Sequence, residues 1–275
     1  MNLPAAASAP PARRLHGSIV AQTSVSSSMH LVEFDLQEHI PFLPGQFCML
    51  NLAGDLSLVF GRPFSILATT GNRLALLYKV VGRGTARLRE AAVGAPVTCL
   101  APLGRPFPAP DPRPRLLLAG GVGLPPLLAW ETRWGRSQDL CCAGGRDGGD
   151  LPWDLLGPAW RTSVDRAVAL PADRPAFDGN VVELARSLLP AGAPPHVVLA
   201  CGPPPLLRAA AALAAERGWD CLVSVEERMG CGYGVCRGCV VPRADGDGYA
   251  TACKDGPVFD ALDLDWARLG GGGGA

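Results

Sequence analysis

The sequence contains no apolar run that could cross a membrane, because glycine, proline or a charged residue interrupts each run well before about 18 residues. It also carries no net charge, since 25 lysines and arginines balance 25 aspartates and glutamates. Nucleic acid or a membrane surface is therefore not expected as a partner. The amino-terminal residues lack the layout of a signal peptide, so we expect the protein to stay in the cytoplasm.

Histidines are scarce as well. The four present are scattered, form no predicted catalytic or metal-binding group, and are expected to be ordinary surface or strand-end residues: His16, His30, His39 and His196. Ten cysteines are present, but thiols stay reduced in the cytoplasm, which argues against a disulfide framework. Six of them lie in apolar runs and are predicted to be small buried hydrophobic residues, with a functional role kept open only for Cys201. These six are Cys48, Cys99, Cys141, Cys142, Cys201 and Cys221.

The pattern of apolar and turn residues divides most of the chain into two parts. In residues 15–110, short apolar or alternating runs separated by turn residues predict an antiparallel barrel or sandwich. One helix is expected there at "GTARLREAA", where Thr85 can cap the first turn. Residues 111–226 alternate strand-like and helix-like segments, which predicts a parallel α/β sheet. The other parts are a disordered lead-in, a cysteine-rich module and a glycine-rich tail, at residues 1–14, 227–269 and 270–275.

Four cysteines in the cysteine-rich module follow the spacing C-x4-C-x2-C-x13-C. Three lie in "MGCGYGVCRGC" and the fourth in "YATACKDGPVF": Cys231, Cys236, Cys239 and Cys253. This spacing matches the plant-type [2Fe–2S] signature, whereas structural zinc usually takes two separated pairs of cysteines. The glycines between them are expected to let backbone amides point at sulfur, some at positive φ. They are Gly230, Gly232, Gly234 and Gly238.

Alternatives to this cluster remain open from the residues alone. The loop could bind zinc, or its cysteines could be free thiols. Cys221 is an alternative fourth ligand, although it sits in an apolar strand ahead of the loop. The gap before Cys253 is also shorter than in ordinary plant-type ferredoxins. A [2Fe–2S] cluster moves one electron at a time, so it requires a donor and an acceptor in the same chain or in a bound partner.

Two glycine-containing turns in the α/β half predict a dinucleotide site. "LLLAGGVGLPPLLAW" places glycines directly between a strand and a helix, where a diphosphate can approach the backbone. The pattern is not G-x-G-x-x-G, so an ordinary tight turn is the alternative. "VVLACGPPPLLRA" repeats the arrangement, and two such turns at neighbouring strand ends would frame one nucleotide. The residues concerned are Gly120, Gly121, Gly123, Cys201, Gly202 and Pro203.

Three features of the first half predict a flavin site. In "GRPFSIL", Arg62 can pair with a diphosphate and Ser65 can hydrogen-bond a ring atom. In "LLYKVVGRGTARL", Tyr78 can stack on a ring, and Gly84-Thr85 opens a helix that favours phosphate. Each feature has an ordinary alternative, namely a surface charge, a core tyrosine and a plain turn. Their occurrence together and in this order favours the flavin site.

Taken in sequence, "RPFS", "GRGT", "AGGVGLPPL" and "ACGPPPLL" resemble the ferredoxin reductase superfamily. "EERMGCGYGVCRGCVV" and "ACKDGPVF" narrow the resemblance to the electron-transfer subunits of class 1B dihydroorotate dehydrogenases. The resemblance implies an α/β plus β-barrel fold, with an FAD-binding barrel, an NAD-binding α/β domain and a [2Fe–2S] module. It also implies that the four spaced cysteines ligate the cluster. The residues implied to bind FAD are Arg62, Pro63, Phe64, Ser65, Leu77, Tyr78, Lys79, Gly84 and Thr85.

The same resemblance implies a partner, an FMN-containing catalytic subunit that oxidises dihydroorotate in pyrimidine synthesis, in a heterotetramer with two copies of each chain. Electrons would pass from FMN through the cluster and FAD to NAD+. Ser65 and Cys201 are candidates for positions near flavin N5. The choice of NAD over NADP stays open, since Arg146 at a strand end could meet a 2′-phosphate. The alternatives are an NAD(P)H-dependent reductase serving a hydrogenase, oxygenase or ferredoxin, and a zinc-bound scaffold.

Overall fold

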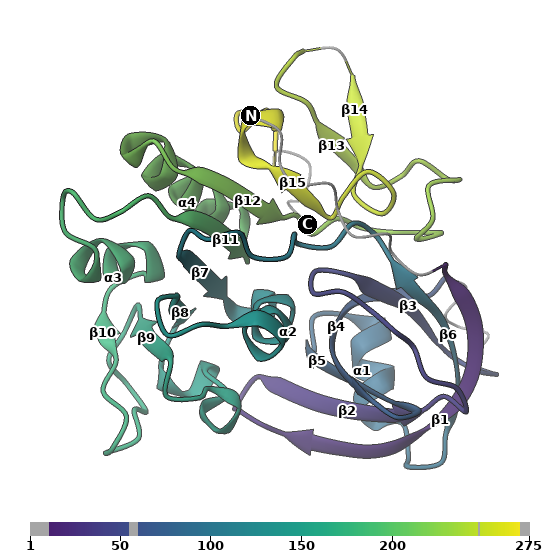
Figure 1. The fold of residues 1–275 in the computed structure, drawn as a ribbon. Helices are drawn as coiled ribbons and strands as arrows, with labels where there is room; N and C mark the ends of the chain where they lie inside the picture. The colour runs from purple at the N-terminus through teal and green to yellow at the C-terminus, as the bar shows by residue number, and fades with distance from the viewer. Residues whose placement is uncertain (1–10, 55–59, 247, 270–275) are drawn as a thin grey trace.

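The computed structural model describes residues 11–54, 60–246 and 248–269 (Figure 1). The predicted glycine-rich tail and residues 1–10 of the predicted lead-in lie outside this description. The first strand begins at Arg13, so the last residues assigned to the lead-in belong to the barrel instead. Within the described ranges, no helix is both long and apolar enough to span a bilayer.

The first part of the chain forms a closed antiparallel barrel, as predicted. Its strands hydrogen-bond in the order β1-β2-β5-β4-β3-β6, and β1 and β6 close the ring. Closure leaves no free strand edge, and alternate side chains fill the interior. The strands are β1 (Arg13–Ser24), β2 (Met29–Asp35), β3 (Phe47–Leu52), β4 (Arg62–Thr70), β5 (Arg73–Lys79) and β6 (Pro96–Leu103).

Helix α1 (Arg83–Glu90) follows β5 and packs through Leu88 on the barrel core. Thr85 caps its first turn, as predicted, but it does so from the third helical position, because Gly82 is the N-cap residue. The Thr85 hydroxyl oxygen accepts hydrogen bonds from the backbone N–H groups of Val81 and Gly82, at 2.9 and 3.2 Å. These bonds satisfy amides at the helix start and fix the turn that enters α1.

The second part is a seven-stranded sheet in the order β10-β9-β8-β7-β11-β12-β15. All neighbouring strands from β10 to β12 run parallel, which confirms the predicted parallel α/β sheet. The parallel strands are β7 (Arg115–Gly120), β8 (Leu140–Gly145), β9 (Trp160–Val164), β10 (Phe177–Asp178), β11 (Val197–Cys201) and β12 (Asp220–Ser224).

Helices cover both faces of this sheet, which explains why its strands are continuously apolar. On β7, Leu116 and Leu118 point to the face covered by α3 and α4, whereas Leu117 and Ala119 point to the face covered by α2. Helix α2 lies between the sheet and the barrel (Figure 1). The helices are α2 (Leu124–Trp134), α3 (Val181–Leu188) and α4 (Pro204–Arg217), and short 3-10 turns are Gly121–Gly123, Gly148–Asp150, Trp153–Leu155 and Ala261–Asp263.

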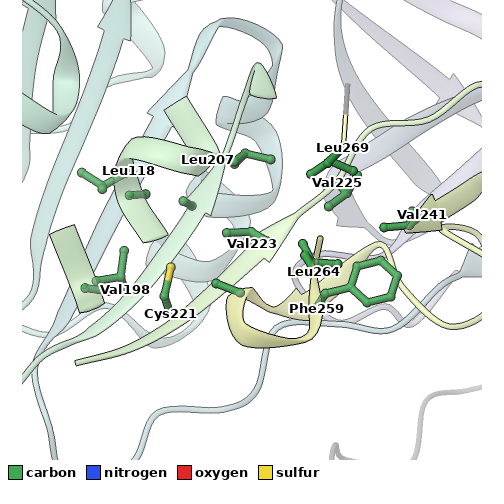
Figure 2. Close-up of a cluster of buried hydrophobic side chains, with 14 of the residues drawn as sticks. Leu118, Val198, Leu207, Cys221, Val223, Val225, Val241, Phe259, Leu264 and Leu269 are labelled. Carbon is green, nitrogen blue, oxygen red and sulfur yellow. The ribbon is translucent and has the colours of Figure 1, made fainter. Parts of the chain in front are cut away.

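The cysteine-rich segment is joined to the edge of the α/β sheet. It contains the hairpin β13 (Val240–Pro242) and β14 (Tyr249–Thr251), and its strand β15 (Val258–Asp260) pairs antiparallel with β12. Figure 2 shows that its side chains continue the core between the sheet and helix α4. Phe259 and Leu264 belong to the same buried cluster as sheet and helix residues. The α/β sheet and the cysteine-rich segment therefore share one core.

A charge network ties together the amino ends of β7 and β12, opposite the strand ends expected to bind nucleotide. Asp111 accepts hydrogen bonds from Arg113 at 2.7 Å and from Arg115 at 2.9 Å, and Arg113 also reaches Asp220 at 2.6 Å. The Arg115 side chain is only 1% exposed. The hydrogen bonds from Arg113, and then those from Arg115, outweigh the effect of burial and lower the pKa of Asp111.

We expect Asp111→Asn to lower the free energy of unfolding by about 2 kcal/mol at neutral pH, because it leaves the buried Arg115 charge without its carboxylate. The folded-state pKa of Asp111 lies below the ordinary value of 3.8, so its stabilisation is complete above that pH and disappears as pH falls further. Urea unfolding of variant and wild type should therefore differ at neutral pH and converge in acid. Glu38→Gln, which removes an exposed ion pair to Arg13, should cost less than about 0.5 kcal/mol at either pH.

Candidate functional site

Two adjoining cavities lie where the barrel meets the α/β sheet. The larger has a volume of about 520 Å³ and opens at the carboxyl ends of β7, β8, β9 and β11. The smaller, of about 210 Å³, lies against β4, β5 and the end of β12. Both are lined by Lys79, Val122 and Glu226, so they meet along a common wall. We call them the nucleotide cavity and the flavin cavity, after the ligands that the sequence analysis expects there.

Most residues predicted to contact FAD line the flavin cavity: Pro63, Phe64, Ser65, Leu77, Tyr78, Lys79 and Thr85. The other two, Arg62 and Gly84, lie together at a neighbouring hollow that Phe64 also lines. A Cβ atom at Gly84 would come within 2.5 Å of Arg62 Nε. The structure thus sets the Arg62 guanidinium across the first turn of α1, where backbone amides and a fixed positive charge can act on the same phosphate group.

Tyr78 presents a rigid wall to the flavin cavity. Its side chain is almost fully buried, its hydroxyl donates to Gln22 Oε1 at 3.0 Å, and Phe64 packs edge-on against its ring with centroids 6.1 Å apart. Burial raises the pKa of Tyr78 to about 12, so the phenol stays neutral at physiological pH. A neutral ring held on two sides is suited to packing against a planar ligand.

Four of the six residues predicted to bind nucleotide line the nucleotide cavity: Gly120, Gly121, Gly202 and Pro203. Gly121 has a φ of +55°, a backbone conformation that favours glycine. Gly123 and Cys201 lie behind these residues and contact each other, since a Cβ atom at Gly123 would come within 2.2 Å of the Cys201 carbonyl oxygen. The two predicted turns are therefore packed backbone against backbone.

Cys201 was a candidate for a position near the flavin ring, and the structure places it behind the cavity wall. It is only 1% exposed, and burial raises the pKa of its thiol. Its side chain hydrogen-bonds Ser224, which lines the flavin cavity at the end of β12. Ser65, the other candidate, lines the cavity directly. Ser224 therefore lines the flavin cavity together with Ser65, whereas Cys201 lies behind it.

Sequence reasoning missed a polar junction between the barrel and the α/β domain. Asp150 is 4% exposed and accepts hydrogen bonds from Lys79 Nζ at 2.7 Å and from the Ser28 hydroxyl. Arg146 reaches the other carboxylate oxygen at 3.4 Å. Burial raises the pKa of Asp150, but the hydrogen bonds from Lys79 and Ser28 outweigh it and hold that pKa low. A buried carboxylate on the nucleotide cavity thus joins the two domains.

Glu226 was also missed, although its place two residues after strand β12 follows the rule that functional groups gather at strand ends. It lines both cavities and is open to solvent in the cleft, and the surrounding protein raises the pKa of its carboxyl group by removing part of its hydration. No such rule could have joined Asp150 to Lys79, since 71 residues separate them in sequence.

The four spaced cysteines form two pairs. The thiol of Cys236 contacts the thiol of Cys231 and helps to lower its pKa. The thiol of Cys239 contacts the thiol of Cys253 and helps to raise its pKa. Within the described residues, no three cysteine, histidine or acidic side chains are arranged around one metal ion. A zinc site requires four ligands around one point, whereas the four protein sulfurs of a [2Fe–2S] cluster are divided between two irons. The paired arrangement therefore fits the cluster better than zinc.

Backbone amides converge on the first cysteine, as the glycines predicted. The N–H groups of Tyr233 and Cys236 both point at Cys231 Sγ at 3.5 Å. Burial raises the pKa of Cys231, but these amide hydrogen bonds outweigh it and the pKa falls to about 6. Gly232 and Gly234 have φ values of +82° and +89°, which produce this amide arrangement. The loop is thus suited to hold negative charge on sulfur.

The cysteine loop packs directly on the flavin cavity. Met229 lines that cavity, and Cys231 follows two residues later, a span of at most about 7 Å along the backbone. Gly232 of the same loop packs against the barrel, since a Cβ atom at this position would lie 2.3 Å from Cγ of Met49 on β3. Cys221, the alternative fourth ligand, instead belongs to the buried core below helix α4 (Figure 2). A group held by the four cysteines would therefore be a close neighbour of a ring in the flavin cavity.

Residues 226–265 match the family described as the iron-sulfur cluster binding domain of dihydroorotate dehydrogenase B. The chain is also similar to proteins described as the electron transfer subunit of dihydroorotate dehydrogenase B (NAD(+)). The protein from Shouchella clausii is 31% identical over 257 residues, covering 88% of this chain and 94% of that protein. The protein from Desulforamulus reducens is 30% identical over 256 residues, covering 90% of this chain and 97% of that protein.

Solved structures resemble this fold over most of the chain. A chain of an NADH-dependent reduced ferredoxin-NADP oxidoreductase superposes with a TM-score of 0.75 at 22% identity, covering 92% of this chain and 91% of that one. A ferredoxin reductase of carbazole 1,9a-dioxygenase superposes with a TM-score of 0.67 at 21% identity, covering 76% and 67%. These likenesses confirm the ferredoxin-reductase-like arrangement of barrel and α/β domain.

Proposed function

Because the chain belongs to the family of dihydroorotate dehydrogenase B electron-transfer subunits, we propose that it carries electrons from a dihydroorotate-oxidising catalytic subunit to NAD+ through a [2Fe–2S] cluster and FAD. The observation that carries the proposal is the arrangement of three sites in a row. The cysteine loop packs on the flavin cavity, and the flavin cavity shares a wall with the nucleotide cavity. A [2Fe–2S] cluster gives up electrons one at a time, whereas NAD+ accepts two together as hydride. A flavin can exchange electrons singly or in pairs, so it has to lie between the cluster and the nucleotide.

Each group has named residues to hold it. The four paired cysteines would ligate the cluster: Cys231, Cys236, Cys239 and Cys253. In the flavin cavity, Tyr78 and Phe64 would orient the ring, Ser65 and Ser224 would offer hydroxyl groups beside it, and Arg62 lies at the helix turn that would suit a diphosphate. The turns at Gly120-Gly121 and Gly202-Pro203 line the nucleotide cavity and would bring backbone close to a bound dinucleotide.

The loop around the cysteines also supports a site for the partner. Cys236 is exposed, and next to it Tyr233 and Val235 leave 54% and 73% of their surface open. Exposed apolar and aromatic side chains beside a redox centre are suited to dock another protein and exclude water. We propose that this surface binds the FMN-containing catalytic subunit, in an assembly with two copies of each chain. The base that deprotonates dihydroorotate would belong to that partner.

The test is to purify this chain anaerobically, alone and together with an FMN-containing dihydroorotate dehydrogenase catalytic subunit. We expect flavin bands together with broad long-wavelength iron-sulfur absorption, and NAD+ reduction that depends on dihydroorotate and on both subunits. Reduction of NAD+ by hydrogen or reduced ferredoxin, but not by dihydroorotate, would assign the chain to another redox partner. A colourless protein carrying zinc would contradict electron transfer altogether.

A further inference from the structure

The barrel and the α/β domain meet through two contacts of different character. One is apolar: helix α2 packs on strand β4, and Met29 and Leu77 of the barrel share a buried cluster with Leu127 of α2. The other is the polar junction around Asp150, on the wall of the nucleotide cavity. Apolar packing has no preferred direction, so the first contact alone would let the two domains shift against each other. Hydrogen bonds require defined distances and angles, so the second contact can fix their relative orientation.

Two turns face each other across the domain boundary at this junction. Residues 25–28 connect β1 to β2 in the barrel, and Gly148–Asp150 lies between β8 and β9. The backbone N–H of Ser27 donates to the carbonyl oxygen of Gly149 at 2.9 Å, and the Ser27 hydroxyl donates to the same oxygen at 2.6 Å. Because one of these bonds joins main chain to main chain, the junction holds the backbones of the two domains together.

The Asp150 carboxylate adds a second, charged set of bonds to the junction. One of its oxygens accepts hydrogen bonds from Lys79 Nζ at 2.7 Å and from the Ser28 hydroxyl, both on the barrel. The other accepts from the backbone N–H of Arg146 at 3.3 Å, within its own domain. The side chain is only 5% exposed, so water competes little with these bonds. Lys79 lines both cavities, which places the junction on the wall where a flavin ring and a nicotinamide ring would meet.

On the proposed function as premise, we propose that Asp150 is a positioning residue for hydride transfer. Through Ser28 and Lys79 it fixes the angle between the barrel and the α/β domain at which the flavin cavity and the nucleotide cavity face each other. Hydride transfer requires the reacting atoms to lie within about 3.5 Å, and a misplacement of about 1 Å can slow a reaction by about 100-fold. Asp150 thus acts through the relative position of the two domains and not on the reacting atoms.

The first experiment follows reduction of bound FAD by NADH in stopped flow, in the cofactor-loaded complex with the catalytic subunit. Its dependence on NADH concentration gives both the limiting rate and the dissociation constant. Asp150→Asn should lower the limiting rate by about 30-fold. NADH binding should not weaken, because the substitution frees the cations of Lys79 and Arg146 to meet its diphosphate. A rate that stays at the wild-type value would overturn the proposal.

Ser28→Ala tests the junction from a position outside the lining of both cavities. It should lower the limiting rate by about threefold. In the double variant with Asp150→Asn, the loss should equal that of Asp150→Asn alone, because Ser28 acts through this carboxylate. Losses that multiply would contradict the shared role of the two residues.

A disulfide between the two turns tests position directly. A Cβ atom at Gly149 would lie 3.5 Å from Cβ of Ser27, at the short end of the range that a disulfide spans. Ser27→Cys with Gly149→Cys, added to Asp150→Asn and oxidised by glutathione disulfide, should restore the rate to within about threefold of wild type. Reduction of the bond by dithiothreitol should remove the rescue. If mass spectrometry shows the bond and the rate stays low, Asp150 acts by its charge and the proposal is overturned.

Hydrogen exchange reports on the junction independently of activity. In the cofactor-loaded complex without nucleotide, exchange of the Ser27 amide should rise by about tenfold in Asp150→Asn, and unchanged exchange would overturn the proposal. Glu216→Gln is the matched control, because it removes an equal charge from an ion pair between α3 and α4 inside the α/β domain. It should leave both exchange and hydride transfer at wild-type values. A wild type whose Ser27 amide is protected but whose FAD is not reduced by NADH would instead contradict the proposed function itself.

Discussion

Dihydroorotate-dependent reduction of NAD+ by the assembled enzyme should fall by at least about 100-fold in Cys236→Ser, with loss of iron and inorganic sulfide from the protein. Cys236 pairs with Cys231 across the loop, and serine replaces a thiolate that iron requires with a poorly matched hydroxyl. The flavin and nucleotide cavities share no residue with this position, so reduction of bound FAD by NADH should survive. The measurements are metal and sulfide analysis, and stopped-flow reduction of the flavin by NADH.

Cys221→Ala is the matched control for this substitution. Cys221 is the alternative ligand that sequence reasoning left open, and it lies in the apolar core on β12. Iron content should stay at the wild-type level in this variant, with only a modest loss of stability. If Cys221→Ala lost its iron while Cys236→Ser kept it, our assignment of the ligands would be wrong. If folded Cys236→Ser protein could no longer reduce its flavin with NADH, the cysteine loop and the two cavities would not function independently.

Gly123→Ala should destabilise the protein by about 3 kcal/mol and weaken NADH binding by more than about tenfold. A Cβ atom at this position would lie 2.2 Å from the carbonyl oxygen of Cys201 and 2.5 Å from the backbone nitrogen of Gly202. Backbone atoms cannot rotate away as a side chain can, so the two turns that frame the nucleotide cavity would have to separate. Thermal unfolding and NADH titration would measure the two effects.

Gly157→Ala provides the comparison, because a Cβ atom there meets nothing within 4 Å and its φ is not in the left-handed region. Its stability and NADH affinity should match those of wild type within about 0.5 kcal/mol. Wild-type NADH affinity in Gly123→Ala would show that the contact between the two turns does not shape the cavity.

Most of the architecture could be predicted from local patterns. Short alternating runs gave the barrel, and strand-helix alternation gave the parallel sheet, because both depend on the burial of side chains at a fixed period. The cysteine spacing and its glycines indicated a cluster loop, and the amide contacts to Cys231 follow from them. Most of the motif residues of the barrel likewise gather on one cavity, with Arg62 and Gly84 at the hollow beside it, because β4, β5 and the start of α1 are neighbours in the fold.

What could not be predicted depends on contacts between distant segments. Strand β15 is three residues long, which is too short to leave a periodic pattern in the sequence. It is recognised as a strand only because it pairs with β12 at the edge of the sheet. The pairing of Lys79 with Asp150 joins a barrel strand to a loop of the other domain. The strand-end position of Cys201 gave its level in the sheet but not the direction of its side chain, which is buried outside the lining of the flavin cavity.

The pairing of β15 with β12 has a consequence for how such proteins can be recombined. Cutting the chain before the cysteine loop would strip β12 of its neighbour and uncover apolar residues such as Val223 and Val225, leaving an open edge prone to aggregate. The cysteine loop is therefore not a cassette that can be transplanted by itself. A graft onto another reductase would have to take β12 along with it, and natural gene fusions that exchanged this segment would be expected to break upstream of that strand.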